Sequence, residues 1–321
     1  MAVTMIPEPG LLDAVRATEL VTATGRPTPD FREKLRRIPN ARNAAAVLAV
    51  YAQTIAIVVL AVRLDNWFAW VAAFILMGRA HAQFAALMHE AAHRLLFRNR
   101  NINDYVGRWL LGFPAFTPTD AYRRGHMAHH RDEFGPDEPD IALYRGYPIS
   151  KDSMRRKLVR DATGRTGWKL FKGLLSAVRS ESAPVRYQAR AIVAIQIVLI
   201  AIGVALHHPW VYFILWLAPY LTVWRVINRL RSIAEHGGMQ RSKDRRFTTH
   251  TVRQSPISRF FVVPFHIGWH LAHHVDAGVP MAHLPKLHAE LRRSGYVVDG
   301  LEYRSYTSLW RKLASGARAG G

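Results

Sequence analysis

Four long apolar stretches place the strongest constraint on how this chain can fold. They cover Ala44–Val62, Trp67–Met88, Ala191–Leu206 and Trp210–Ile227, and the second helix is expected to continue through His93. A helix needs about 20 apolar residues to cross a bilayer, and four such runs are unusual in soluble proteins. The sequence therefore predicts an all-α integral membrane protein with four transmembrane helices. The alternative is a soluble protein with four buried core helices.

Short links between these stretches predict two helical hairpins. Arg63–Asn66 alone separates the first two spans, and His207–Pro209 alone separates the last two. Lys and Arg are concentrated in the segment before the first span, in residues 94–190 and in the segment after the fourth span. The whole chain has 44 Lys and Arg against 23 Asp and Glu. Positive residues concentrate on the cytoplasmic side of membrane proteins. We therefore expect both termini and both long segments in the cytoplasm.

The formal net charge of +21 also raises the question of nucleic acid as a partner. The sequence shows no stripe of basic and aromatic residues for base stacking, so we expect no nucleic-acid binding and interpret the charge as topology and lipid contact. Tyr105–Phe116 is too short to cross a membrane and is expected to be re-entrant or interfacial. Trp168–Val178 has amphipathic spacing, which predicts either an in-plane membrane helix or a helix packed on the protein.

Along the chain we expect three parts. They are a cytoplasmic N-terminal segment over 1–43, a membrane domain over 44–290, and a cytoplasmic C-terminal segment over 291–321 that ends in the disordered tail SGARAGG. The first 43 residues contain no apolar stretch followed by a small-residue cleavage site, so we expect no secretory signal peptide.

Histidine is concentrated in three short motifs, HEAAH at 89–93, HMAHH at 126–130 and HLAHH at 270–274. Residues three and four apart share one face of a helix, so each motif aims its imidazoles at one point. Another histidine follows the fourth span in SIAEH at 232–236. All four elements come just after membrane spans on the same side, so we expect them to converge. The candidate metal ligands are His89, His93, His126, His129, His130, His236, His270, His273 and His274.

Nine imidazoles brought together at neutral pH need a partner, and a metal ion is the obvious one. Zinc takes four ligands, whereas two metals with four or five nitrogen ligands each would use the whole set. The chain has no cysteine. Nitrogen ligation without thiolate suits iron, and open positions on iron suit dioxygen chemistry, although other divalent metals stay open. We expect ordinary structural roles for His81, His207, His208, His250, His266, His283 and His288.

The HEAAH motif also matches the HExxH pattern of zinc metalloproteases, in which the glutamate is the general base. An intramembrane zinc protease is therefore a second hypothesis. It gives a role to His89, Glu90 and His93, but it leaves the histidines of the other two motifs without one.

The three motifs and the paired spans resemble the three histidine boxes of the membrane fatty acid desaturase and hydroxylase family. The resemblance extends from about Ala44 to His288 and includes His236 as the family's additional histidine. Around the third box, PFHIGWHLAHH is also similar, except that members often carry Asn where this chain has His266. The runs HEAAHRLLFRN and DEPDIALYRGYP resemble the bacterial branch that includes the rhizobitoxine-type desaturases, which implies a bacterial inner membrane.

This resemblance implies a bundle of four transmembrane helices in two hairpins, with a helical cytoplasmic cap in which the nine histidines hold a di-iron centre of two iron ions. The implied activity is that of an oxygen-dependent fatty acid or lipid desaturase, which introduces a double bond into an acyl or alkyl chain and uses dioxygen as co-substrate. A hydroxylase or monooxygenase of the same family begins with the same hydrogen abstraction and is the alternative. The lipid or acyl-chain substrate would enter from the membrane.

No G-x-G-x-x-G or P-loop sequence is present, so electrons are expected from an external carrier, such as a ferredoxin with its reductase. Such carriers are often acidic, which an Arg-rich cap would suit. Metal-bound histidines usually donate their other N–H to a carboxylate or carbonyl. The acids near the boxes are Glu90, Asp132, Asp140, Glu235 and Asp276. Of these, we expect Glu90 and Glu235 to orient ligands.

Overall fold

The computed structural model describes residues 4–12 and 15–316. The contacts of the chain divide it into two compact units. Unit 1 consists of Met1–Pro39, Arg124–Arg156 and Arg229–Gly321, and unit 2 consists of Asn40–Arg123 and Lys157–Asn228. Each unit is therefore assembled from segments that are far apart in the sequence, and both are mostly helical.

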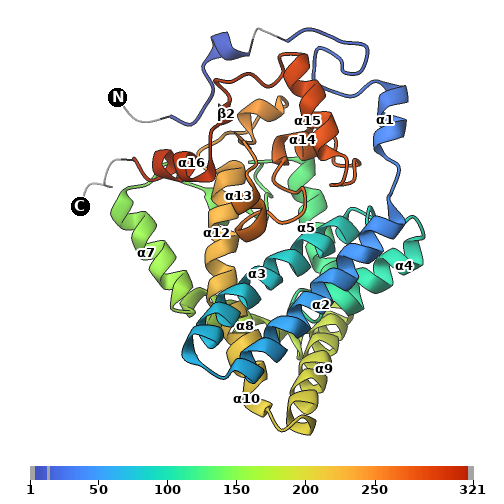
Figure 1. Ribbon diagram of the computed structural model, residues 1–321. Helices are drawn as coiled ribbons and strands as arrows, with labels where there is room; N and C mark the ends of the chain where they lie inside the picture. The colour runs from blue at the N-terminus through green and yellow to red at the C-terminus, as the bar shows by residue number, and fades with distance from the viewer. Residues whose placement is uncertain (1–3, 13–14, 317–321) are drawn as a thin grey trace. The chain divides into compact units, whose positions relative to one another are not determined.

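Unit 2 is built on long helices (Figure 1). Two of them, α2 (Asn40–Leu64) and α3 (Trp67–Ala92), lie against each other, and Arg79 Nη1 donates to Gln53 Oε1 between them at 2.9 Å. The other elements of unit 2 are α4 (Arg100–Tyr105), the π-helix η2 (Val106–Gly112), α8 (Arg165–Ala177), α9 (Ala183–Ala205), α10 (Pro209–Tyr212), the π-helix η3 (Phe213–Leu217) and α11 (Ala218–Leu221). Three helices have residues in both units: α5 (Thr119–Arg131), α7 (Lys151–Ala162) and α12 (Val223–His236).

Among the described residues, four helical runs are long and apolar enough to cross a membrane, and each overlaps one of the predicted stretches. They are Pro29–Leu64, whose apolar part is α2, together with Trp67–Ala92, Ala183–Ala205 and Pro209–His236. The third run begins before the predicted Ala191 and the fourth ends after the predicted Ile227. The helices are longer than the apolar stretches because polar residues such as Arg186 and Glu235 continue the helix beyond the apolar region.

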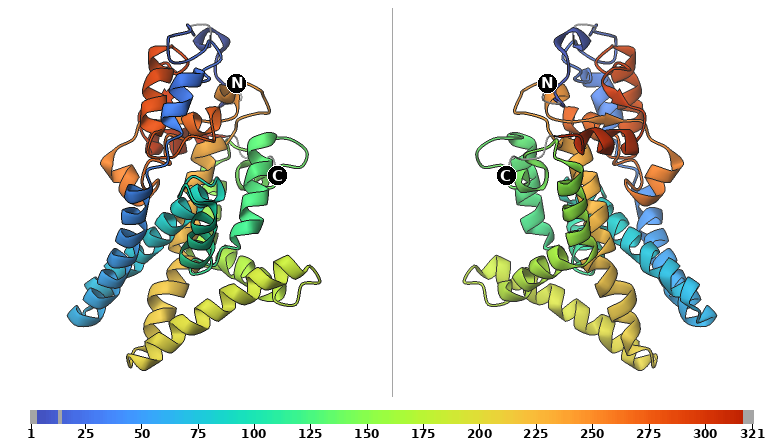
Figure 2. Two further views of the ribbon diagram at one scale, coloured as in Figure 1. Left: turned by 90° about the vertical axis from the view of Figure 1, so that its right-hand side faces the viewer. Right: turned by 90° about the vertical axis from the view of Figure 1, so that its left-hand side faces the viewer.

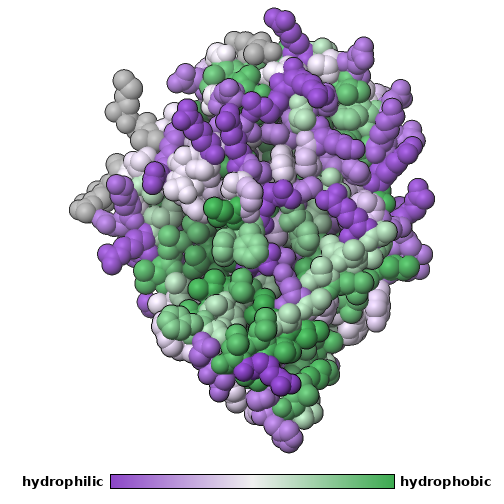
Figure 3. Space-filling model, viewed as in Figure 1, coloured by the Kyte–Doolittle hydropathy of each residue, from purple (hydrophilic) through white to green (hydrophobic). Residues whose placement is uncertain are grey.

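The surface of unit 2 is apolar. The side chains of Leu48, Phe68 and Ile197 are 70%, 68% and 60% exposed. Figure 3 shows hydrophobic residues gathered over the helices of this unit. Contiguous apolar surface of this kind marks contact with a membrane or a partner. Together with the four long apolar helices, it indicates a multi-pass membrane protein.

Polar side chains inside unit 2 are hydrogen-bonded. Gln196 Nε2 donates to the carbonyl oxygen of Phe113 at 3.0 Å, and Gln196 Oε1 accepts from the hydroxyl of Tyr212 at 2.9 Å. Trp216 Nε1 donates to the carbonyl oxygen of Pro114 at 3.0 Å. Lipid offers no hydrogen bonds to exposed backbone groups, so such groups must be satisfied internally. These side chains satisfy the backbone where the chain turns after η2.

The two shorter apolar stretches are largely helical. Tyr105–Phe116 begins at the end of α4 and continues through η2 into a turn. Trp168–Val178 lies mostly in α8, where Trp168 and Leu170 are about half exposed. Their placement at the membrane surface stays a prediction.

Unit 1 consists of shorter helices around a buried core. Leu287 and Leu291 of α15 (Leu284–Arg293) and Leu309 of α16 (Tyr306–Leu313) are fully buried in it. Figure 2 shows α1 (Pro29–Leu35) beside α14 (His270–Val275) and α15, where Arg32 Nε donates to Asp276 Oδ2 at 2.5 Å. The other elements are η1 (Pro9–Leu11), α6 (Ile141–Tyr144), η4 (Arg245–Phe247) and α13 (Pro256–Phe261).

Unit 1 also contains two short parallel strands, which the prediction of an all-α fold did not include. In this pair, β1 (Thr251–Val252) lies beside β2 (Glu302–Tyr303), with Thr251 opposite Glu302. Two residues are too few for an alternating pattern to be visible in the sequence. The predicted disordered tail falls largely on residues 317–321, which lie outside the described residues.

Candidate metal centre

The second and third histidine boxes are both helical and lie together in unit 1. Within this unit, His126 and His130 project from α5, and His273 projects from α14. His130 Nε2 lies 3.1 Å from His126 Nε2 and 3.0 Å from His273 Nε2. We call these three residues the 126 cluster. The predicted i, i+3, i+4 geometry therefore brings nitrogens from two separate helices to one point.

A second group of imidazoles lies beside the first. His270 Nε2 is 3.1 Å from His236 Nε2 and 3.0 Å from His274 Nε2. One nitrogen of His129 lies within 4.8 Å of nitrogens of His236 and His274. We call these four residues the 236 cluster. The rings of His130 and His274 stack at a centroid distance of 4.3 Å, so the two clusters are in direct contact.

The outer nitrogens of the 236 cluster are held by acceptors. His129 Nδ1 donates to Glu138 Oε1 at 2.7 Å, and His274 Nδ1 donates to Glu133 Oε1 at 2.6 Å. His236 Nδ1 donates to the carbonyl oxygen of Thr248 at 2.8 Å. A carbonyl only accepts, so the proton of neutral His236 is on Nδ1 and its Nε2 presents a lone pair inward. Metal-bound histidines typically have this arrangement.

This geometry fits a bound cation. The inner nitrogens of His236 and His274 both present lone pairs to His270 Nε2 at 3.0–3.1 Å. A single proton on His270 Nε2 satisfies one of these contacts and not both. A cation bound between the three Nε2 atoms would attract the lone pairs of all three. The side chains are buried, and burial and nearby imidazoles lower the pKa of both His270 and His274 well below its usual value. They are therefore neutral near pH 7, as metal ligands must be.

His89 and His93 belong to unit 2. His89 lies in the last turn of α3, and His93 caps the C-terminal end of that helix. Their ring centroids are 4.7 Å apart, so the two side chains share a face as predicted from their spacing. Between them, Glu90 is buried. The two histidines of the first box are thus already arranged side by side as a pair of candidate metal ligands.

The carboxylates that touch the histidines are mostly not those expected. Glu133 and Glu138, which hold His274 and His129, were missed in the sequence. Glu235 Oε1 lies 3.6 Å from His270 Nδ1 and accepts from Arg231 Nε at 2.6 Å. In the sequence, Glu133 and Glu138 lie just after the second box, but Asp132 shares this position and does not contact a histidine of the boxes among the hydrogen bonds described.

Other acids and histidines near the boxes have structural partners. Asp132 pairs with Arg241 at 2.8 Å, and Asp276 pairs with Arg32. His250 Nε2 donates to the carbonyl oxygen of Gly237 at 2.7 Å, as expected for a structural histidine. Four more histidines follow the same pattern or pack on aromatic rings: His81 on Trp216, His208 on Trp210, His266 on Trp269, and His288 against Glu302.

Comparison with known proteins adds independent information. The family model for "Fatty acid desaturase" matches residues 65–307. The chain is 24% identical over 263 residues to the dihydrorhizobitoxine desaturase of Bradyrhizobium elkanii, which covers 76% of this chain and 73% of the relative. It is also 32% identical over 72 residues to the sn-1 oleoyl-lipid 12-desaturase of Arthrospira platensis, which covers 22% of this chain and 20% of that relative.

Proposed function

Because this chain belongs to the fatty acid desaturase family, we propose that it is an oxygen-dependent membrane desaturase that introduces a double bond into an acyl or alkyl chain. The single observation that supports this most strongly is the pair of adjoining imidazole clusters in unit 1. Two clusters of inward nitrogens match a centre of two metal ions. The relatives are named for two different substrates, dihydrorhizobitoxine and an oleoyl lipid, so substrates of both kinds are candidates.

The proposed ligands are the nine histidines of the boxes. The 126 cluster and the 236 cluster supply seven, and we propose His89 and His93 as the remaining two because their paired rings have the spacing of the first box. The set contains no thiolate, because the chain has no cysteine. Nitrogen ligands suit iron, and iron when bound supplies the redox chemistry that activates dioxygen. Thiolates would be at risk of oxidation in such a site.

The roles of this chain's own residues follow from their contacts. Glu133, Glu138 and the carbonyl of Thr248 hold three imidazoles with their lone pairs inward. The burial of these groups restricts water at the centre. In the net reaction the substrate loses two hydrogen atoms and dioxygen becomes two waters, with two further electrons and two protons supplied from outside. We propose a ferredoxin-type carrier with its reductase as the electron source.

The same proposal includes the membrane orientation and the three segments of the chain that were inferred from the sequence. Both termini and the metal centre would lie in the cytoplasm, with the helices arranged as two hairpins in an inner membrane. The zinc protease hypothesis uses only the first box and gives no role to the seven histidines that cluster in unit 1. Family membership in the desaturases also argues against it.

The test is expression with a ferredoxin and its reductase, followed by mass spectrometry of host lipids and added alkyl substrates. A product lighter by two mass units supports desaturation, and one heavier by sixteen would instead indicate the hydroxylase. His274→Ala should abolish product and lower bound iron, because it removes a donor of the 236 cluster. His207→Asn is the matched control, since His207 is exposed in the link between α9 and α10. Full product from His274→Ala would contradict the proposal.

A further inference from the structure

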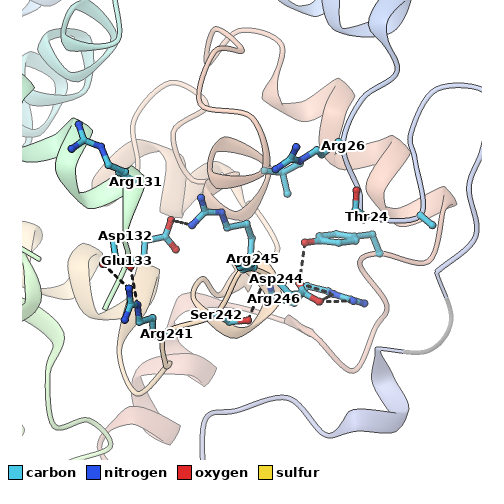
Figure 4. Close-up of a pocket in the computed structure, with 14 residues that line it drawn as sticks. Thr24, Arg26, Arg131, Asp132, Glu133, Arg241, Ser242, Asp244, Arg245 and Arg246 are labelled. Carbon is cyan, nitrogen blue, oxygen red and sulfur yellow. Dashed lines mark hydrogen bonds and ion pairs between the residues drawn. The ribbon is translucent and has the colours of Figure 1, made fainter. Parts of the chain in front are cut away.

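A basic pocket lies in unit 1 (Figure 4). It has a volume of about 840 Å³, and residues from the segments 23–26, 131–133 and 241–246 form most of its lining, together with Val275 and Tyr296. Val275 directly follows His274, and Arg131 directly follows His130. The wall of the pocket is therefore continuous with the helices that carry the second and third boxes.

The charge of the basic pocket is unbalanced. Its lining has six cationic side chains and three acids, which leaves an excess of three positive charges. Each acid has an arginine partner within the lining: Asp132 with Arg241, Glu133 with Arg245, and Asp244 with Arg246. The excess therefore resides on Arg26, Arg131 and Lys243. These three side chains are exposed, and no acid among the described residues forms an ion pair with them.

Arg245 and Glu133 line the pocket on the side of the histidines and form an ion pair with each other. Arg245 Nη2 donates to the carbonyl oxygen of His130 at 3.1 Å, and Arg245 also pairs with Glu133. The same Glu133 accepts from His274 Nδ1 at 2.6 Å. A chain of hydrogen bonds thus joins the pocket surface to the 236 cluster. An electron can pass along this chain of hydrogen bonds without an opening in the wall.

From this arrangement we propose that the basic pocket is the docking surface for an acidic, one-electron carrier protein that reduces the metal centre. This inference rests on the proposed function. Each docking event oxidises one reduced carrier and delivers one electron, so two events supply the two electrons of one desaturation, and solvent supplies the two protons. The carrier would bind by its acidic surface to Arg26, Arg131 and Lys243.

The distribution of charge favours a protein over a small anion. The less exposed arginines of the lining, Arg245 and Arg246, are paired with Glu133 and Asp244, and the exposed Arg241 is paired with Asp132. The unpaired charges are at exposed positions, where single contacts are weak but several together steer a charged partner. Redox partners typically form small, transient interfaces of this electrostatic kind. A small phosphate-bearing ligand would instead need unpaired cations in the depth of the pocket.

The experiment measures binding of a purified plant-type [2Fe–2S] ferredoxin, which is acidic, to the detergent-solubilised full chain by surface plasmon resonance. The test variant is Arg131→Glu/Lys243→Glu. The matched control is Lys286→Glu/Arg311→Glu, which reverses one Lys and one Arg at exposed positions of unit 1 outside the pocket lining. We expect on the order of tenfold weaker binding for the test variant at low salt and less than about twofold for the control.

Salt and electron transfer provide further readouts. The difference between the variants should disappear near 1 M salt, where the screening length is about 3 Å. Stopped-flow oxidation of the reduced ferredoxin by the iron-loaded protein should slow in the test variant by a similar factor, while iron content stays equal to wild type.

Two outcomes would overturn the docking proposal. One is wild-type ferredoxin binding and electron transfer in the test variant while wild-type protein still forms product, which leaves the proposed function intact. The other is tight binding of inorganic pyrophosphate that is lost in the test variant while ferredoxin binding is retained, which would indicate a small-anion site. If no product forms but ferredoxin binding depends on Arg131 and Lys243, the docking surface stands and the desaturase activity is what fails.

Discussion

The two units of this protein distribute polar and apolar residues in opposite ways. Unit 2 exposes large apolar side chains such as Leu48 and Ile197 and directs Gln196 inward. Unit 1 buries imidazoles and carboxylates, including His274 and Glu133, and hydrogen-bonds them to one another. The difference shows that unit 2 is organised by its lipid environment, whereas the interior of unit 1 is organised by its histidines and their acceptors.

The largest effect should come from a charge on the apolar surface of unit 2. Ile197→Lys places an ammonium in the middle of α9 on a side chain that is 60% exposed. Lysine at the centre of a membrane helix costs about 3 kcal/mol for insertion. We expect a large loss of membrane-integrated protein, measured by extraction with alkaline carbonate.

Thr307→Lys is the corresponding change in unit 1, at an exposed position of α16. We expect it to leave membrane integration unchanged, because α16 is not one of the helices long and apolar enough to cross a membrane. Equal losses in both variants would remove the distinction between the two surfaces.

A smaller effect should follow from weakening the polar interior of unit 1. Glu138→Gln removes the negative charge that accepts from His129 Nδ1. Loss of such an acceptor typically lowers metal affinity 10- to 100-fold, or about 1.4–2.7 kcal/mol. Metal affinity is measured by titration with cobalt(II) and competition with a chelator. The neighbouring Asp137→Asn, at an exposed position, should have no effect, and a matching loss there would argue against a role for Glu138 in orienting His129.

The smallest effect is expected at Glu302, a buried acid of unit 1 distant in sequence from the boxes. Burial alone would raise the pKa of Glu302, but hydrogen bonds from His288 and Arg253 lower it to about 2. The folded-state pKa is thus below the ordinary value. The carboxylate therefore stabilises the fold above about pH 4.5, and this contribution is lost as the pH falls toward 2.

Glu302→Gln should accordingly lower the free energy of unfolding by about 1 kcal/mol at pH 7. Its difference from wild type should shrink progressively below pH 4.5, as followed by thermal unfolding. The exposed Asp299 pairs with Arg253 and Arg292, both of which also pair with Glu302, and Asp299→Asn should change stability little. If the difference in stability between Glu302→Gln and wild type instead grew as the pH fell, this would contradict a folded-state pKa of Glu302 below its ordinary value.

The sequence predicted the features that depend on local spacing. The four spans, the helical form of the second and third boxes, and the shared face of His89 and His93 all follow from residues within a few turns of each other. The helix ends were less accurate. The predicted apolar stretch begins at Ala191, whereas α9 begins at Ala183 and includes the polar turns around Arg186.

The features that were missed depend on contacts between distant segments. Glu133 accepts from His274, which is 141 residues further along the chain, and no local pattern distinguishes Glu133 from the surface acid Asp132 beside it. The β1–β2 pair likewise joins residues about 50 positions apart. Such pairings are fixed by tertiary packing, which overrides what a short window of sequence can indicate.

The acceptor for His236 is a main-chain carbonyl, that of Thr248, whereas His129 and His274 depend on carboxylates. Every amino acid, proline included, keeps this oxygen, so substitution at position 248 does not delete the acceptor. One imidazole of the centre is thus protected against point mutation of its partner. A substitution at position 248 that keeps the backbone path therefore leaves the acceptor of His236 in place, whereas replacing Glu133 or Glu138 by a residue without a carboxylate removes the acceptor of His274 or His129.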